Sequence, residues 1–205
     1  MRAELQAERA ELPAPRTEEG MTLEQAMLAR RSHRSFAPVP LELWQIGQLL
    51  WAAQGLVKPG RRRRTAPSAG ACYALELYLA CAEGWFHYLP EGHALERLAT
   101  GDRRPALAAA AHGQAFVAEA DVVLLLAGDY SRTTSRYGDR GVRYVHMDIG
   151  HAAQNVLLEA AALGLGAVPV GAFVDAELTR VAELPPGQDA LYMVPVGHPA
   201  EQRQP

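Results

Sequence analysis

The stretch VRYVHMDIGHAAQNVLLEAAAL, residues 142–163, carries the clearest structural signal in the chain. Its apolar residues recur three and four positions apart, which is the spacing of a helix that buries one face. The residues in this series are Val142, Val145, Ile149, Ala152, Val156, Ala160 and Leu163. The spacing predicts a helix of about 22 residues, twice the usual length, and we expect this helix to be the spine of the domain.

Short apolar or alternating runs predict strands before and after this helix. Apolar residues alternate in LELYLAC at 75–81, and Glu83-Gly84 predicts a hairpin turn into a second strand, WFHYL. The unbroken apolar run VVLLL at 122–126 predicts a central strand. Two more strands are predicted at 167–170 (AVPV) and 190–196 (ALYMVPV).

Other segments predict helices and one long loop. A helix begins after Thr22, where Gln25 completes a capping box, and a second helix is predicted at 41–54. Short helices are predicted within 94–113 and a further helix at 175–184, whereas a polar loop is expected between residue 126 and the long helix. Strands and helices do not alternate strictly, which favours an α+β fold over a doubly wound sheet.

Composition excludes several classes of protein. A chain of 205 residues with a net charge of −3 suits one domain and argues against a dedicated nucleic-acid binder. No run of about 18 apolar residues predicts a membrane span. Cys72 and Cys81 do not have the spacing of a metal site or a disulfide scaffold, so we expect reduced thiols and a cytoplasmic protein. Asp148 and His151 share a helix face, but two ligands without a third do not make a metal site.

Arginine is abundant for a reason unrelated to binding. Lys58 is the one lysine among 20 basic residues, and Asn155 is the one asparagine, as expected from a GC-rich genome. Single arginines, including the run Arg61 to Arg64, are therefore weak signals on their own. The first 20 residues contain five glutamates and no apolar core of a signal peptide. We expect residues 1–20 to form a poorly ordered or partner-clasping arm, and residues 21–205 to form one domain.

The segment ARRSHRSF at 29–36 is the most informative polar cluster. Arg30, Arg31, Ser32 and Arg34 place three guanidinium groups and a hydroxyl where a helix ends. Guanidinium groups bind phosphate bidentately, and a serine hydroxyl adds one hydrogen bond. A basic helix C-terminus explains one or two of the arginines, so both a structural and a phosphate-binding interpretation stay open on the residues alone.

Four motifs in order resemble the nitroreductase family of flavin enzymes. They are RRSHRSF, TAPSAGACYALELYL, DIGHAAQNVLLEAAALGLGAVPVGAF and PVGHP, which together span about residues 22–199. PSAG before the LELYL strand and the segment YGDRGVRYVHMDIGH are most similar to the SagB-type branch, which includes peptide azoline dehydrogenases. The resemblance implies an α+β fold with a mainly antiparallel sheet flanked by helices. It also implies a homodimer with two FMN molecules at its interface, to which the long helix contributes.

The resemblance also implies which residues bind FMN. The family segment that holds the phosphate and ribityl chain matches Arg30, Arg31, Ser32 and Arg34. The segment that approaches the ring from the partner chain matches Pro67, Ser68, Ala69 and Gly70. The stretch whose backbone N–H faces the flavin N5 matches Pro169, Val170, Gly171 and Ala172. Gln114 is the expected partner of the pyrimidine end of the ring, and Arg203 is the basic residue expected to return to the phosphate.

Arg136 and Tyr137 occupy the positions of a catalytic pair in the resembling branch. Peptide azoline dehydrogenases have a Lys-Tyr pair before the GDR segment as base and acid, whereas this chain reads SRYGDRG. Arginine stays protonated and is not a base at neutral pH. Either azoline oxidation is lost, or the substitution reflects codon bias and another residue is the base.

The resemblance thus implies an FMN-dependent oxidoreductase that transfers two electrons through N5. In the reductase direction NAD(P)H is the donor, and in the dehydrogenase direction a small molecule or peptide is. One alternative is a SagB-type dehydrogenase of thiazoline and oxazoline rings. A second is a flavin-binding scaffold without turnover in a biosynthetic complex, and a third is an unrelated α+β ligand-binding domain.

Overall fold

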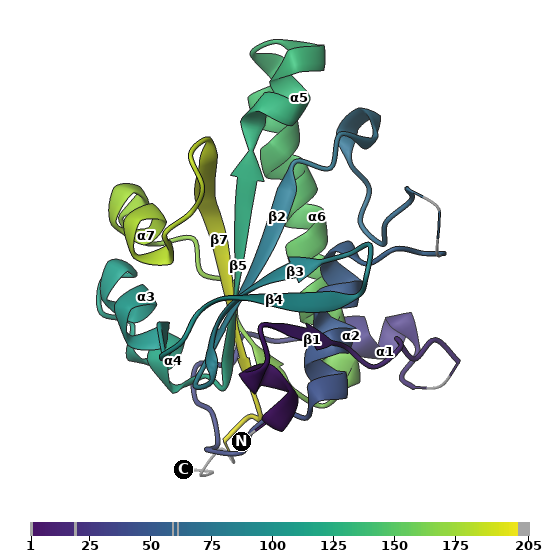
Figure 1. The fold of residues 1–205 in the computed structure, drawn as a ribbon. Coiled ribbons are helices and arrows are strands. Elements are labelled where there is room, and N and C mark those ends of the chain that lie inside the picture. Colours follow the sequence, from purple (N-terminus) through teal and green to yellow (C-terminus); the bar gives the residue numbers. More distant parts are fainter. Residues whose placement is uncertain (1, 19, 59, 61, 201–205) are drawn as a thin grey trace.

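The computed structural model describes residues 2–18, 20–58, 60 and 62–200. In these residues seven strands form one antiparallel sheet in the order β1-β4-β3-β2-β5-β7-β6 (Figure 1). The strands are β1 (Arg9–Glu11), β2 (Leu75–Cys81), β3 (Gly84–Leu89), β4 (Ala94–Ala99), β5 (Val122–Asp129), β6 (Gly166–Ala167) and β7 (Gln188–Gly197). The antiparallel α+β fold predicted from the sequence is confirmed.

Helices cover both faces of the sheet. The helices are α1 (Leu23–Ala29), α2 (Leu43–Gln54), α3 (Arg104–Ala110), α4 (Ala115–Glu119), α5 (Tyr130–Tyr137), α6 (Arg140–Ala162) and α7 (Asp175–Ala182), with 3-10 turns η1 (Ala3–Gln6) and η2 (Ala69–Ala71). One side carries α1, α2 and α6, and the other carries α3, α4 and α7 (Figure 1). None of the helices in the described residues has the length and apolar character needed to cross a bilayer.

Strand β5 lies between two apolar cores. Val122, Leu124 and Leu126 pack in the core that contains residues of α2 and α6. The alternate residues Val123 and Leu125 pack in the core that contains residues of α3 and α7. Burial on both faces explains why the predicted strand is an unbroken apolar run.

Helix α6 is the predicted long helix and spans 23 residues. Val145, Ile149 and Val156 are buried against the sheet as expected, whereas Val142 near the helix start is 39% exposed. The side-chain amide of Asn155 donates a hydrogen bond of 3.0 Å to the Ala52 carbonyl, which ties α6 to α2.

The segment 94–99, expected to be helical, is instead strand β4. Its residues ALERLA are good helix formers, but the segment pairs with β3 on one side and with β1 on the other. Tertiary pairing therefore outweighs the local helix preference. The prediction of helix within 94–113 holds for α3, which begins at Arg104.

The polar segment expected to be a loop after β5 is instead helix α5. Its sequence YSRTTSRY contains no aliphatic residue, and although Tyr130, Thr133 and Tyr137 recur at helical spacing, the polar residues outnumber them and favour the interpretation as a loop. The Asp129 side chain caps the helix by accepting the Ser131 backbone N–H at 3.0 Å, and the buried Thr133 lies against α6. Capping and packing on a neighbouring helix thus stabilise a short helix whose residues are mostly polar.

The N-terminal residues, expected to be a poorly ordered or partner-clasping arm, pack against their own chain. Leu5 is fully buried, and Ala10 and Leu12 belong to the same core as β2 and β5. Strand β1 pairs with β4 in register Ala10 opposite Leu95. The charged residues that suggested a solvated arm alternate with these buried ones.

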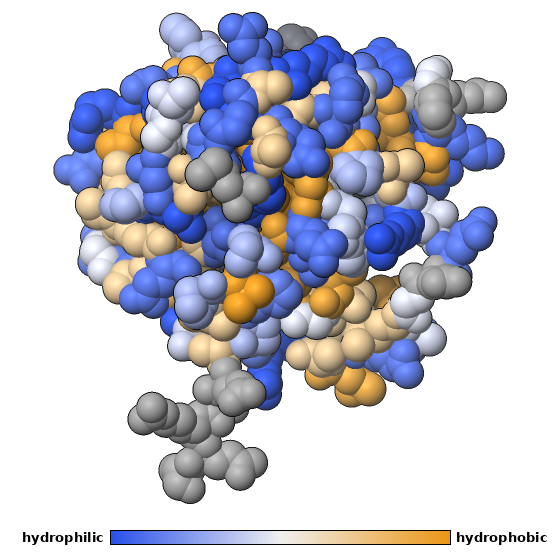
Figure 2. Space-filling model, turned by 60° about the horizontal axis from the view of Figure 1, so that its bottom comes forward, coloured by the Kyte–Doolittle hydropathy of each residue, from blue (hydrophilic) through white to orange (hydrophobic). Residues whose placement is uncertain are grey.

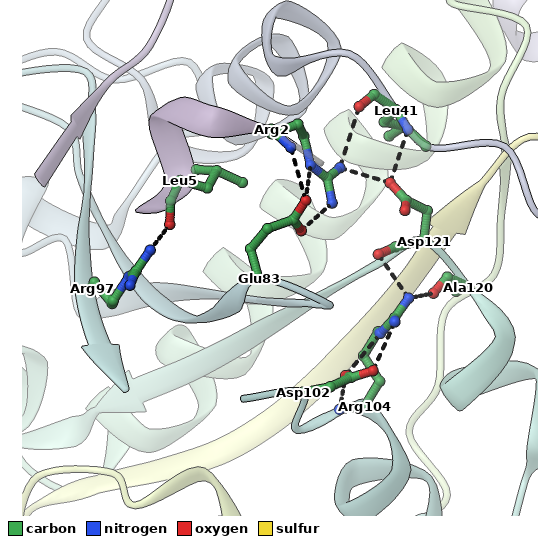
Figure 3. Close-up of polar contacts among 9 residues, drawn as sticks. All are labelled: Arg2, Leu5, Leu41, Glu83, Arg97, Asp102, Arg104, Ala120 and Asp121. Atoms are coloured by element: carbon green, nitrogen blue, oxygen red, sulfur yellow. Dashed lines mark hydrogen bonds and ion pairs between the residues drawn. The ribbon is translucent and has the colours of Figure 1, made fainter. Parts of the chain in front are cut away.

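Arg2 is the ionic anchor of this segment (Figure 3). Its guanidinium group binds Glu83 at 2.7 Å and Asp121 at 2.8 Å, and it donates to the Leu41 carbonyl at 3.2 Å. The Arg2 and Glu83 side chains are only 8% and 6% exposed. Arg2 therefore joins the N-terminal segment to the β2–β3 turn, to the start of β5 and to the segment before α2.

We predict that Arg2→Ala lowers the free energy of unfolding by about 3–5 kcal/mol, because it leaves the buried Glu83 carboxylate unpaired. Urea denaturation measures this value. Arg9→Ala is the matched control, since the Arg9–Glu11 pair is 54% and 69% exposed and its loss should cost about 0–1 kcal/mol. Equal effects of the two substitutions would contradict the anchoring role.

We also predict that part of the stability is lost in acid through Glu83. Burial alone would raise the Glu83 pKa, but hydrogen bonds from Arg2 outweigh burial and lower the pKa to about 2. Because the folded-state pKa lies below the unfolded value, this stabilisation is complete above about pH 4.5 and declines as the pH falls toward 2. Glu83→Gln should flatten the decline in urea midpoints measured between these pH values.

Candidate functional site

The segment Arg30–Arg34 lies beside the segment 166–172, although more than 130 positions separate them in the sequence. Ser32 forms a parallel bridge with Ala167, and the His33 N–H donates to the Ala167 carbonyl at 3.0 Å. A Cβ atom on Gly166 would lie 2.9 Å from the His33 Cβ, so glycine is needed for this approach. The fold thus unites two of the segments predicted from sequence to form one site.

The arginines of the first segment have no acidic partner in the described chain. Arg30, Arg31 and Arg34 form no ion pair with any described carboxylate, and Arg31 and Arg34 are exposed. Arg31 donates to the His33 ring at 3.3 Å, and the Arg34 guanidinium lies 5.9 Å from the centroid of the Phe116 ring. Their positive charge is therefore left for an external anion.

The segment Pro169–Ala172 is fixed by β7 and by Gln114. Val170 and Met193 exchange backbone hydrogen bonds of 2.8 and 3.0 Å, which hold the residues that follow. The Gln114 side-chain amide donates to the Ala172 carbonyl at 3.1 Å. Gly171 is exposed, and its N–H has no acceptor among the described residues.

Gly171 lies on the wall of two adjoining cavities, of about 540 and 330 Å³. His146, Gly171 and Leu191 line both cavities. The larger one extends between α5 and α7, where Tyr130, Asp175 and Asp189 complete its wall. Gly171, whose N–H has no acceptor among the described residues, is therefore within reach of a molecule in either cavity.

Pro67–Gly70 and the Arg136–Tyr137 pair form a second group. The Arg136 guanidinium donates to the Gly70 carbonyl at 3.1 Å, and it lies 5.4 Å from the centroid of the Tyr137 ring. Gly70 has a φ of +58°, and a Cβ atom there would lie 2.6 Å from the Tyr137 hydroxyl. The positive φ therefore favours glycine at this position independently of any ligand, whereas the ends of the Arg136 and Tyr137 side chains could move aside.

Asp148 and Arg132 position the second group, a role that sequence analysis did not assign to them. The buried Asp148 carboxylate accepts the Ala69 N–H at 3.1 Å, and Arg132 donates to the Tyr73 carbonyl at 3.0 Å. Arg132 also pairs with Glu76 and with Asp129. Burial would raise the Glu76 pKa, but hydrogen bonding to His87 and the charge of Arg132 lower it.

The two groups lie on different sides of α6. Asp148 faces Pro67–Gly70, whereas Ile149 and Gly150 line the smaller cavity with Gly171. In the part of the chain that the structure describes, no hydrogen bond joins one group to the other. Arg203, the predicted phosphate ligand, and Arg61 of the arginine run lie outside the described residues.

The larger cavity also contains a hydrogen-bonded pair that was not predicted from the sequence. The Tyr130 hydroxyl lies 2.6 Å from the Nε2 atom of His146, and the two rings meet edge to face with centroids 5.6 Å apart. Tyr130 begins α5 and His146 lies on α6, so only the packing of the two helices brings them together. No local motif signals such a pair.

Known proteins resemble this chain over nearly its whole length. The nitroreductase family model matches residues 27–198. MJ1384 of Methanocaldococcus jannaschii, named as a nitroreductase, is 43% identical over 197 residues, which cover 93% of this chain and 98% of MJ1384. The Escherichia coli microcin B17-processing protein McbC is 30% identical over 136 residues, which cover 61% of this chain and 50% of McbC.

Solved structures agree with these relatives. A Ralstonia eutropha protein named as a nitroreductase has a TM-score of 0.86 and 29% identity, covering 96% of this chain and 92% of its own. The resemblance predicted from the four motifs is thereby confirmed. The chain belongs to the nitroreductase family of oxidoreductases.

Proposed function

We propose that the protein is an FMN-dependent oxidoreductase that transfers two electrons between NAD(P)H and an organic acceptor such as a quinone or nitro compound. One observation supports this proposal above all. Three arginines without acidic partners lie on the segment that pairs with Ala167, and four residues further along the chain Gly171, whose N–H has no acceptor among the described residues, lines two cavities. When bound, FMN supplies the hydride chemistry, and the protein supplies position and electrostatics.

The residues present fit the two ends of FMN. Arg30, Arg31 and Arg34 would bind the phosphate with charge-assisted hydrogen bonds, together with the Ser32 hydroxyl. Arg203 is proposed to join them. Gln114 uses its amide N–H groups on the Ala111 and Ala172 carbonyls. Its Oε1 atom, which no described residue donates to, is left for an N–H of the pyrimidine ring.

Gly171 is proposed to face N5. Its backbone N–H would stabilise negative charge that develops on the reduced ring, without need of a particular side chain. The Val170–Met193 hydrogen bonds fix this donor in advance, so little reorganisation accompanies electron transfer.

We further propose a homodimer that brings the two groups of site residues together. Pro67–Gly70, Arg136 and Tyr137 would reach the flavin bound by the partner's first group. Exposed apolar residues suit such an interface: Leu23, Met27 and Leu28 on α1 are 57%, 56% and 87% exposed, and Met147 on α6 is 50% exposed. Helix α1 lies at the right in Figure 1, and Figure 2 shows apolar surface on the same side.

A peptide azoline dehydrogenase is the second candidate, favoured by the match to McbC. Its proton chemistry needs a base at the position of Arg136, which holds the Gly70 carbonyl and stays protonated. The reductase direction, in which no such base is required, therefore fits the residues better.

The proposal is tested by adding FMN to flavin-free protein and then NADH or NADPH without oxygen. We expect a yellow protein that is bleached by the nicotinamide and recoloured by a benzoquinone. A colourless protein would contradict flavin binding. A yellow protein bleached by neither nicotinamide nor a thiazoline peptide would instead support a scaffold.

We predict that Arg34→Ala weakens FMN binding by about 10- to 100-fold, the effect of losing a charge-assisted contact of about 1.5–3 kcal/mol. Fluorescence titration of FMN measures the affinity. Arg9→Ala removes an equal charge on β1, far along the sheet from β6, and should leave the affinity unchanged. Equal affinities of the Arg34 variant and the wild type would remove Arg34 from the phosphate site.

We predict that Gly171→Ala weakens FMN binding while leaving the fold intact. A Cβ atom at Gly171 would meet only the Tyr192 ring at 3.5 Å, an ordinary van der Waals contact. The protein therefore tolerates the methyl group. A loss of FMN affinity would show that this methyl group crowds the bound flavin ring. The control is urea unfolding of the flavin-free variant, which should match that of the wild type. Unchanged FMN affinity would argue against placing Gly171 beside the flavin ring.

A further inference from the structure

The larger cavity beside Gly171 is lined by a Tyr–His pair that has no role in the proposed flavin chemistry. His146 lines both adjoining cavities together with Gly171, and Tyr130 lines the larger one. The Tyr130 hydroxyl and the His146 Nε2 atom are 2.6 Å apart, and no described residue hydrogen-bonds the other ring nitrogen, Nδ1. His146 is exposed and lines the cavity, so a molecule bound there can approach its ring.

We infer that His146, held by Tyr130, is the catalytic residue that exchanges a proton with the substrate at the flavin site. This inference rests on the proposed function, because it places the substrate between His146 and the flavin edge at Gly171. It also supplies a residue that exchanges a proton, a role for which Arg136 is unsuited. The proton donor would come from α6 of the chain that contributes Gly171, and Arg136 would need no proton-transfer role.

The hydrogen bond keeps the imidazole ring in one orientation throughout proton transfer. In the charged ring, Nε2–H donates to the Tyr130 oxygen and Nδ1–H is left for the substrate. After Nδ1 loses its proton, Nε2–H still donates to Tyr130. The ring therefore needs no flip between the two states.

Charges around the pair suit a proton donor. Asp175 of α7 and Asp189 of β7 line the same cavity, and its described wall contains no lysine or arginine. Burial, with the charges of Asp189 and Asp175, raises the Tyr130 pKa, so the phenol stays neutral. Tyr130 then acts as a positioning residue, and His146 is the group that exchanges the proton.

The proposed step balances for a quinone acceptor. The quinone takes two electrons and one proton, as a hydride, from flavin already reduced by NAD(P)H. It takes a second proton from Nδ1 of charged His146. A hydroquinone leaves, and neutral His146 regains its proton from water, so NAD(P)H, one proton and the quinone yield NAD(P)+ and the hydroquinone.

His146→Gln tests this step, because a glutamine amide keeps a hydrogen bond to Tyr130 but carries no exchangeable charge at neutral pH. In rapid mixing of reduced, FMN-loaded enzyme with a benzoquinone, the wild-type rate should fall as the pH rises through the imidazole pKa. The variant should be slower by about 100- to 10,000-fold at the acid end, and its pH profile should be flat. Its FMN absorbance should equal that of the wild type.

The structure offers a matched control in a second Tyr–His pair. The Tyr88 hydroxyl lies 2.9 Å from Nδ1 of His93, and those rings also meet edge to face, but neither residue lines the cavities at Gly171. Tyr130→Phe should slow quinone reduction several-fold and move the midpoint of the pH profile. Tyr88→Phe should change neither the rate nor the profile.

A measurement without turnover completes the test. The imidazole proton resonance that is missing from the His146→Gln spectrum should shift when FMN is added to flavin-free wild-type protein. A yellow His146→Gln enzyme with the wild-type rate and pH profile, or a resonance that FMN leaves unmoved, would overturn this inference alone. Wild-type protein that binds no FMN would overturn the proposed function and this inference together.

Discussion

Helix α6 buries Val145, Ile149 and Val156 against the sheet, and the positions of the candidate site residues depend on this packing. Burial of each such side chain contributes about 1.5–3 kcal/mol, so the helix is not free to slide or turn. The polar residues of α6 are therefore held in fixed positions, from which they contact neighbouring segments. Asp148 holds Pro67–Gly70 through the Ala69 N–H, and His146 meets Tyr130 of α5.

The sequence predicted those elements whose own residues bury a regular face. Periodic apolar residues predicted α6, and the run on β5 predicted a strand that is buried on both sides. The segment 94–99 could not be predicted, because pairing with two strands overrides its helix-forming residues. Helix α5 was not predicted either, because its residues are mostly polar and it is stabilised by a cap and by a neighbouring helix.

The candidate site also has parts that could be predicted from the sequence and parts that could not. Segments 30–34, 67–70 and 169–172 could be found because each is contiguous and matches a family motif. The Tyr130–His146 pair and the Arg132 contacts join separate elements, so they became visible only in three dimensions. The structure also shows which arginines have acidic partners, a distinction that an arginine-rich sequence alone does not provide. Among the described residues six arginines have acidic partners: Arg2, Arg9, Arg64, Arg103, Arg104 and Arg132.

The short strand β1 has a consequence for self-association. An unpaired strand edge is a template for adding strands from other molecules. Here the edge of β4 is covered by a strand of three residues whose exposed side chains include Arg9 and Glu11. The charged side chains and short length of β1 therefore discourage edge-to-edge aggregation at this end of the sheet.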